Sequence, residues 1–295
     1  MPLLSVLTAV HSGAASFLAE AGASALDQAL PEGWELEWIV QEDGSASQAV
    51  RDRLPDDDRV SYRANGAHLG TAATRNFGLA RLRGKYVQNL DADDLLLPGA
   101  ASRIIDTMER EPGLHWAFGQ ADDLMPDGRR ISFDSWIPPV GRMPARRLTA
   151  WVDGHGGNWP LPCAGVLYRT TTIRALGGWA ALPIGQDIAM LAAVSELTDG
   201  WQDETTTWLY RQHERQVSRH PSQQEWSKIA RLVALQRVSS LRLTATALQS
   251  TTDDAIPIPD LGESMKGAVD LQQGSLTPTV SSPTPVPTTL LESGA

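Results

Sequence analysis

Three carboxylates lie within four positions at the end of a strand-like run. Asp91, Asp93 and Asp94 directly follow "KYVQNL", residues 85–90. Carboxylates this close repel one another unless solvent, a helix N-terminus or a cation compensates. One interpretation is an acidic turn before a helix that starts near Pro98. The other is a site for a hard divalent cation, which prefers carboxylate oxygen ligands.

The elements that must position these carboxylates alternate between strands and helices. Such alternation predicts an α/β fold with right-handed crossovers and a mostly parallel sheet covered on both faces. Ligands of such sheets bind beyond the carboxyl ends of the strands, where "VHSG", "QEDGS" and "LDADD" are all expected. The first half is predicted to have strands at 3–10, 35–41, 59–63 and 85–90, and helices at 14–30, 47–54 and 70–84.

The second half is less regular. It is predicted to hold two strands joined by a turn within 114–133, and further strands at 161–169 and 205–213. Helices are expected from 170 to Gly177-Gly178, at 186–197 and at 223–243. After about residue 250 the sequence becomes rich in Pro, Ser and Thr, and we expect this tail to be disordered.

Composition excludes several classes of function. The chain has 295 residues and a net charge of −10, and six acids against one base follow residue 252, so the body is only mildly acidic. This charge argues against a nucleic-acid-binding surface. Cys163 is the single cysteine, which excludes an intrachain disulfide and a cysteine-rich zinc site. No apolar run reaches the roughly 20 residues of a transmembrane helix, and a cytoplasmic protein is expected. Oligomeric state has no signature in the sequence.

Four segments in order resemble glycosyltransferase family 2. They are "SVLTAVHS", "WIVQEDGS", "GTAATRNFGLARLRGKYVQNLDADD" and "LGGWAALPIGQDIAML", and the resemblance spans residues 3–220. It implies a GT-A-type nucleotide-sugar transferase fold over residues 1–250, followed by the tail at 251–295. Within this domain it implies a nucleotide-sugar-binding half at 1–123, an acceptor-binding half at 124–222 and a C-terminal helix at 223–249.

The resemblance also implies roles for the acidic cluster. It places the family's D-x-D motif on Asp91, Ala92 and Asp93, with Asp93 on the metal and Asp91 nearer the ribose. A divalent cation, Mn²⁺ or Mg²⁺, would neutralise the charge that develops on the departing diphosphate. Some relatives carry a His after the last strand that helps to bind metal or phosphate, and His213 is the candidate here. A structural role is the alternative for this histidine.

The resemblance implies that three segments contact the nucleotide half of the donor. In the family a carboxylate of the second loop accepts from the imide N–H of uracil, and either Glu42 or Asp43 could do so. An arginine of the third segment reaches the nucleotide or its phosphates. The implied nucleotide-contacting residues of the first and third segments are Ala9, Val10, His11 and Arg75.

The acceptor side supplies the proposed base. The acceptor hydroxyl must lose its proton as it attacks the sugar, and a carboxylate can take that proton. The family places this Asp at the start of a helix after a Gly-rich turn, which points to Asp187. Gln186 stands where a Glu usually precedes it. Trp179 could stack on a sugar of the donor or pack in the core.

The sequence thus favours a metal-dependent inverting glycosyltransferase that moves a sugar from a UDP-sugar to a hydroxyl of a discrete acceptor. The Gln-x-x-Arg-Trp motif of processive synthases is absent, which favours single-sugar transfer. One alternative is a nucleotide- or carbohydrate-binding protein without transferase activity. Another is a sugar-phosphate nucleotidyltransferase, although the first loop lacks the Lys or Arg that would hold a triphosphate.

Overall fold

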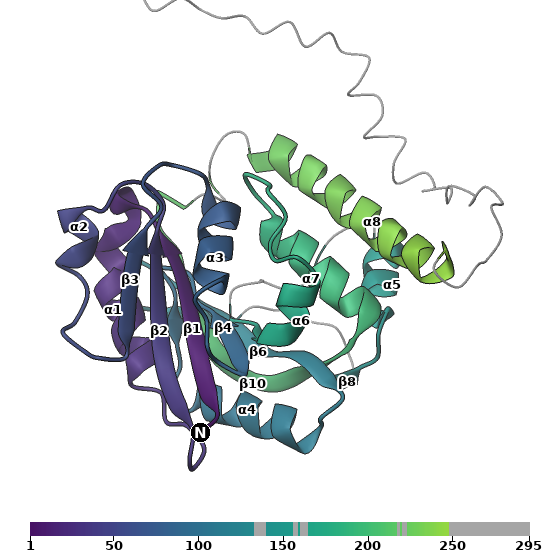
Figure 1. Ribbon diagram of the computed structural model, residues 1–295, viewed down its shortest axis with the longest axis horizontal. Coiled ribbons are helices and arrows are strands. Elements are labelled where there is room, and N and C mark those ends of the chain that lie inside the picture. Colours follow the sequence, from purple (N-terminus) through teal and green to yellow (C-terminus); the bar gives the residue numbers. More distant parts are fainter. Residues whose placement is uncertain (133–139, 156–158, 160–164, 217–218, 220–222, 248–295) are drawn as a thin grey trace, which may run out of the picture. The chain divides into compact units, whose positions relative to one another are not determined.

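The computed structural model describes residues 1–132, 140–155, 159, 165–216, 219 and 223–247 (Figure 1). All of them belong to the first of two compact units, Met1–Asp260. The predicted tail, Cys163 and residues 161–164 of the predicted 161–169 strand lie outside the described residues. The boundaries predicted for the domain therefore stay a prediction.

The structure is an α/β fold built on one mixed, mostly parallel sheet. Its strand order is β3-β2-β1-β4-β9-β6-β10-β5, with β7 added beside β6 and β8 beside β10. Strands β1 to β4 run parallel, and β6 and β10 are parallel to each other, whereas β9 runs antiparallel between β4 and β6. The strands are β1 Leu3–Val10, β2 Glu35–Glu42, β3 Val60–Ala64, β4 Tyr86–Asn89, β5 Leu95–Leu96, β6 Leu114–Leu124, β7 Arg130–Ser132, β8 Gly141–Met143, β9 Leu167–Arg169 and β10 Asp199–Arg211.

Helices cover both faces of this sheet, as Figure 1 shows. One apolar cluster joins one face of β1 to α1 and α4, and a second joins the opposite face to α3, α5, α6 and α7. Because β1 is buried on both faces, its sequence is mostly apolar, with only Ser5 and Thr8 as polar residues. The helical segments are η1 Ser12–Phe17, α1 Leu18–Leu26, α2 Gln48–Arg51, α3 Thr71–Leu79, α4 Ala100–Arg110, α5 Arg147–Gly154, α6 Thr170–Ala175, α7 Gln186–Leu197 and α8 Gln223–Ala247.

Most predicted elements are confirmed, and several bounds differ. The predicted helix at 14–30 is a 3-10 turn followed by α1, and the predicted helix at 70–84 ends at Leu79. The last strand begins at Asp199 rather than at 205. The predicted turn within 114–133 joins β6 and β7, which pair antiparallel.

The last helix packs on the preceding one. Ala234 and Val238 of α8 form an apolar cluster with Ala192 of α7. Farther along α8, Arg242 donates to the buried carboxylate of Glu196, at 2.8 Å from Nε to Oε1. In Figure 1, α8 lies across α7 with its N-terminal end toward α3 and its later turns toward α5. None of the helices in the described part of the chain is long and apolar enough to cross a membrane.

Candidate active site

A cleft of about 300 Å³ opens beyond the carboxyl ends of the parallel strands. The loops after β1, β2 and β4 all contribute to it, as the strand pattern predicts. Nine predicted site residues line it: Ala9, Val10, His11, Asp43, Arg75, Asp91, Ala92, Asp93 and Asp187. Glu42, Trp179 and His213 do not line it.

The two acidic residues at the end of β2, Glu42 and Asp43, have different environments. Glu42 is 1% exposed, and its carboxylate accepts hydrogen bonds from the Tyr62 hydroxyl and, at 3.0 Å, from the Ser47 amide. Burial and the Glu42 carboxylate raise the pKa of Tyr62. Glu42 thus fixes the loop from behind, and Asp43 is the carboxylate that faces the cleft.

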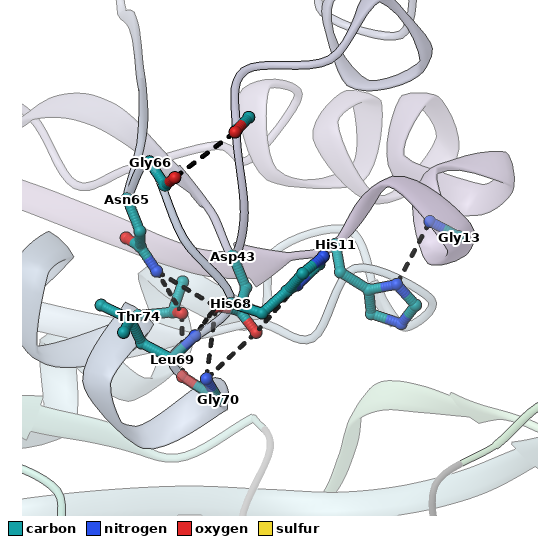
Figure 2. Close-up of polar contacts among 10 residues, drawn as sticks. His11, Gly13, Asp43, Asn65, Gly66, His68, Leu69, Gly70 and Thr74 are labelled. Atoms are coloured by element: carbon teal, nitrogen blue, oxygen red, sulfur yellow. Dashed lines mark hydrogen bonds and ion pairs between the residues drawn. The ribbon is translucent and has the colours of Figure 1, made fainter. Parts of the chain in front are cut away.

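Asp43 in turn holds the segment that leads into α3 (Figure 2). Its Oδ1 accepts from the Leu69 amide at 2.7 Å, and its Oδ2 accepts from the Gly70 amide at 3.1 Å. Asn65 connects the same elements, because its Nδ2 donates to Oγ1 of Thr74 at 2.8 Å. These bonds join the loop after β2 to the helix that carries Arg75.

Arg75 is a buried cation between two carboxylates. Its side chain is 3% exposed, and Nη2 lies 2.5 Å from Oδ1 of Asp91. Burial disfavours the charged guanidinium, but Asp91 and Asp187 outweigh it and raise the pKa of Arg75. Nε and Nη1 are buried without a hydrogen-bond partner among the described residues. A buried donor without a partner is costly, so these two groups are suited to a ligand oxygen in the cleft.

Trp179 supports Arg75 from the core. The indole is 3% exposed, belongs to the apolar cluster under α3 and lies 5.9 Å from the guanidinium carbon. Asn76 fixes its backbone twice, since it donates to Trp179 O at 2.8 Å and accepts from Trp179 N at 2.9 Å. Of the two roles predicted for Trp179, this burial supports core packing rather than contact with a sugar.

The acidic cluster after β4, like the pair Glu42 and Asp43, has members that face the cleft and a member that is buried. Asp91 and Asp93 line the cleft, whereas Asp94 is fully buried and its Oδ1 accepts from the Arg211 amide at 3.0 Å. Burial, together with Asp93 and Asp91, raises the pKa of Asp94 well above its ordinary value of 3.8. Asp94 therefore anchors the acidic loop to the end of β10.

Asp93 is a largely buried carboxylate beside a second carboxylate, Asp91. Burial and the neighbouring Asp91 raise its pKa, and the hydrogen bond with His213 opposes this shift. The conflict between two adjacent carboxylates is one that a divalent cation would relieve, so this donor set fits Mg²⁺ or Mn²⁺. Among the described residues no group of three or more His, Cys, Asp or Glu is arranged to hold a metal. Oxygen atoms of a bound ligand or of water would have to complete the coordination.

His213 contacts Asp93 through a defined ring nitrogen. The Arg215 amide donates to Nδ1 at 3.2 Å, which assigns the proton of the neutral ring to Nε2. Nε2 lies 2.9 Å from Oδ2 of Asp93 and donates to it. In this arrangement His213 orients the carboxylate, and it would have to lose that proton to bind a metal itself. Its predicted role as a ligand stays a prediction.

Asp187 lies at the start of α7, where the helix dipole favours an anion. Its Oδ1 accepts from the Ile188 amide at 2.9 Å. Burial raises the pKa of Asp187, and Arg75 opposes that shift. A carboxylate with a raised pKa in a cleft has the properties of a general base near neutral pH.

Residues outside the predicted set complete the cleft. Most come from the turn before α7, the segment after β10 and the first turns of α8, and two come from the start of α3 and the end of β10. The sequence signals for them are Gln186, which stands where a Glu usually precedes the base, Gly185 before α7 and the small residue Ala230 on α8. These additional residues include Thr71, Pro183, Gly185, Gln186, Tyr210, Arg215, Gln216, Ser227 and Ala230.

Known proteins with similar sequences include two that are named for O-antigen and succinoglycan biosynthesis. The chain is 29% identical to O-antigen biosynthesis protein RfbC of Myxococcus xanthus over 148 residues, 48% of this chain and 11% of that protein. It is 30% identical to succinoglycan biosynthesis protein ExoO of Rhizobium meliloti over 134 residues, 44% of this chain and 38% of that protein. The matches therefore span less than half of either relative.

Solved structures show the same fold. TarS 1-349 of S. aureus in complex with UDP-GlcNAc superposes with a TM-score of 0.60 at 14% identity, over 84% of this chain and 73% of that one. The same protein in complex with UDP gives a TM-score of 0.53. Residues 5–158, just over half of the chain, match the family described as Glycosyl transferase family 2. The chain belongs to glycosyl transferase family 2.

Proposed function

We propose that the protein transfers a sugar from a UDP-sugar to a hydroxyl of a discrete acceptor, with inversion at the anomeric carbon and with a divalent cation. The observation that carries this proposal is one cleft holding two carboxylates at the end of β4, a third at the start of α7, and Arg75 between them. The TarS structures in complex with UDP and UDP-GlcNAc support a uridine nucleotide as the donor half. The relatives named for O-antigen and succinoglycan biosynthesis support glycan chemistry.

Each part of the cleft has a step in this reaction. Asp43 faces the space where the base would lie, and the unpartnered N–H groups of Arg75 would donate to donor oxygens. Asp93 would hold the cation, which would neutralise charge on the leaving diphosphate, and Asp91 would lie nearer the ribose. Asp187 takes the proton of the acceptor hydroxyl while the oxygen of that hydroxyl bonds to the anomeric carbon. The bond from that carbon to the diphosphate oxygen breaks, and its electron pair leaves with UDP.

Measurement of UDP release from a UDP-sugar also tests the two alternative functions that the sequence left open. A binding protein without transferase activity would bind the nucleotide but release no UDP from a UDP-sugar. A nucleotidyltransferase would consume a nucleoside triphosphate and a sugar phosphate, and membership of glycosyl transferase family 2 disfavours it.

Calorimetric titration with UDP, with and without Mn²⁺, tests the nucleotide and metal parts of the proposal. We expect UDP to bind more tightly with Mn²⁺ than in EDTA, and Asp93→Ala to remove that difference. Asp127→Ala is the matched control, because Asp127 is an exposed acid that pairs with Arg129 at 2.6 Å and does not line the cleft. Equal UDP affinity for Asp93→Ala and the wild type in both conditions would refute a metal at Asp93.

A further inference from the structure

One face of α8 extends beyond the helix that it covers. Trp226, Ala230, Ala234 and Val238 follow one another at intervals of four, so they form one ridge along the helix. The last three are at most 4% exposed, whereas Trp226 is 37% exposed. The ridge is therefore buried from Ala230 onward, and its first residue, Trp226, is exposed to solvent.

The cover ends where the cleft begins. A Cβ atom on Gly185, the residue before α7, would lie 2.4 Å from Cβ of Ala230, so this turn and α8 are in direct contact. Trp226 lies one helical turn before Ala230, about 5.4 Å along the axis. The ridge thus brings Trp226 past the N-terminus of α7, the end of the helix that carries Asp187.

The neighbours of Trp226 belong to the wall of the cleft. Ser227 and Ala230 both line it, together with Arg215 and Gln216 from the segment after β10. Trp226 itself does not line the cleft, but it lies one residue before Ser227 and one helical turn before Ala230, so it is next to a wall that holds a hydroxyl, an amide and a guanidinium. This wall is on α8 and its approach, outside the 5–158 region that matches the family.

A flat apolar ring beside polar groups matches the chemistry of a sugar. A pyranose has an apolar face of C–H groups and an edge of hydroxyls, and an indole offers a large, rigid surface for the former. We propose that Trp226 and Ser227 form an acceptor subsite in which a carbohydrate ring stacks on the indole and directs a hydroxyl toward Asp187. This inference rests on the proposed function and adds the acceptor's class and its place of binding.

Saturation-transfer NMR with small glycosides tests this subsite. The probes are the methyl glycosides of glucose, galactose, mannose, N-acetylglucosamine and rhamnose, each added to the full chain with UDP and Mg²⁺. We expect the ring C–H protons of at least one glycoside to receive saturation. Trp226→Ala should weaken that glycoside about tenfold, and Trp226→Phe should retain most of the binding because it keeps a flat ring.

Two measurements make the outcome decisive. Phe77→Ala is the matched control, since Phe77 is a 50% exposed aromatic residue on α3, whereas Trp226 is on α8, and it should leave glycoside binding unchanged. UDP affinity should be equal in all variants. The inference is overturned if UDP binds but no glycoside does, or if Trp226→Ala binds glycosides as the wild type does. If UDP does not bind the wild type, the proposed function fails first.

Discussion

Replacement of Gly185 tests whether α8 is packed on the turn that carries the proposed base. Gly185 has φ +74°, and its added Cβ would lie 2.4 Å from Cβ of Ala230. The left-handed conformation costs an alanine about 1–2 kcal/mol. Overpacking against Ala230 costs about 1–3 kcal/mol more. We therefore expect Gly185→Ala to lower the free energy of unfolding by about 2–5 kcal/mol.

Gly177→Ala separates the two costs. Gly177 has φ +77°, but a Cβ there would meet nothing within 4 Å, so only the backbone cost of about 1–2 kcal/mol applies. Urea denaturation of both variants gives the difference, which is the cost of the contact with α8. Adding Ala230→Gly should recover part of the loss in Gly185→Ala and none of the loss in Gly177→Ala. Equal destabilisation of the two single variants would refute the packing of α8 on this turn.

Two further predictions follow from buried polar groups near the cleft. Asn76→Ala removes both hydrogen bonds to the Trp179 backbone and should lower the free energy of unfolding by about 1–3 kcal/mol in urea denaturation. A loss within about 0.5 kcal/mol, as at an ordinary surface site, would contradict a stabilising role for these two hydrogen bonds. The raised pKa of Asp94 means that, from about pH 3.8 upward to that pKa, the folded protein keeps a proton that the unfolded chain has released. The stability of the wild type should therefore fall relative to Asp94→Asn as pH rises through this window. Denaturation in metal-free buffer at pH 4, 6 and 8 measures this, and a difference that does not change with pH would show that Asp94 is ionised throughout.

Much of the fold could be predicted because its strands are buried on both faces. The mostly apolar sequence of β1 and the apolar run 188–194 within α7 each mark one element, and α7 has the predicted bounds 186–197. The start of β10 was not predicted, because Asp203 and Glu204 resemble a turn. In the structure Asp203 is buried and accepts from Nε of Arg103 at 2.8 Å, which lets a charged residue sit within a strand. The register of β10 against β6 also shifts between Gln202 and Thr206.

Some residues of the site could be predicted from local sequence patterns, and others depend on tertiary packing. The loops after β1, β2 and β4 reach the cleft because strand ends in a parallel sheet share an edge, and this follows from the strand pattern alone. Whether Glu42 or Asp43 faces the cleft depends on the hydroxyl of Tyr62 from the neighbouring strand β3. The contribution of Ser227 and Ala230 depends on how α8 packs against a turn about 45 residues earlier. Neither of these can be read from a local pattern.

The turnover of Asp187→Asn tests the central claim most directly. The assay is release of UDP from the UDP-sugar that binds the wild type with Mn²⁺, measured beside the affinity for UDP. A lost general base predicts a fall in kcat of about 10²–10⁴-fold, with UDP affinity unchanged because the proposed mechanism assigns Asp187 to the acceptor rather than to the nucleotide. A kcat within threefold of the wild type would contradict Asp187 as the base and the mechanism that depends on it.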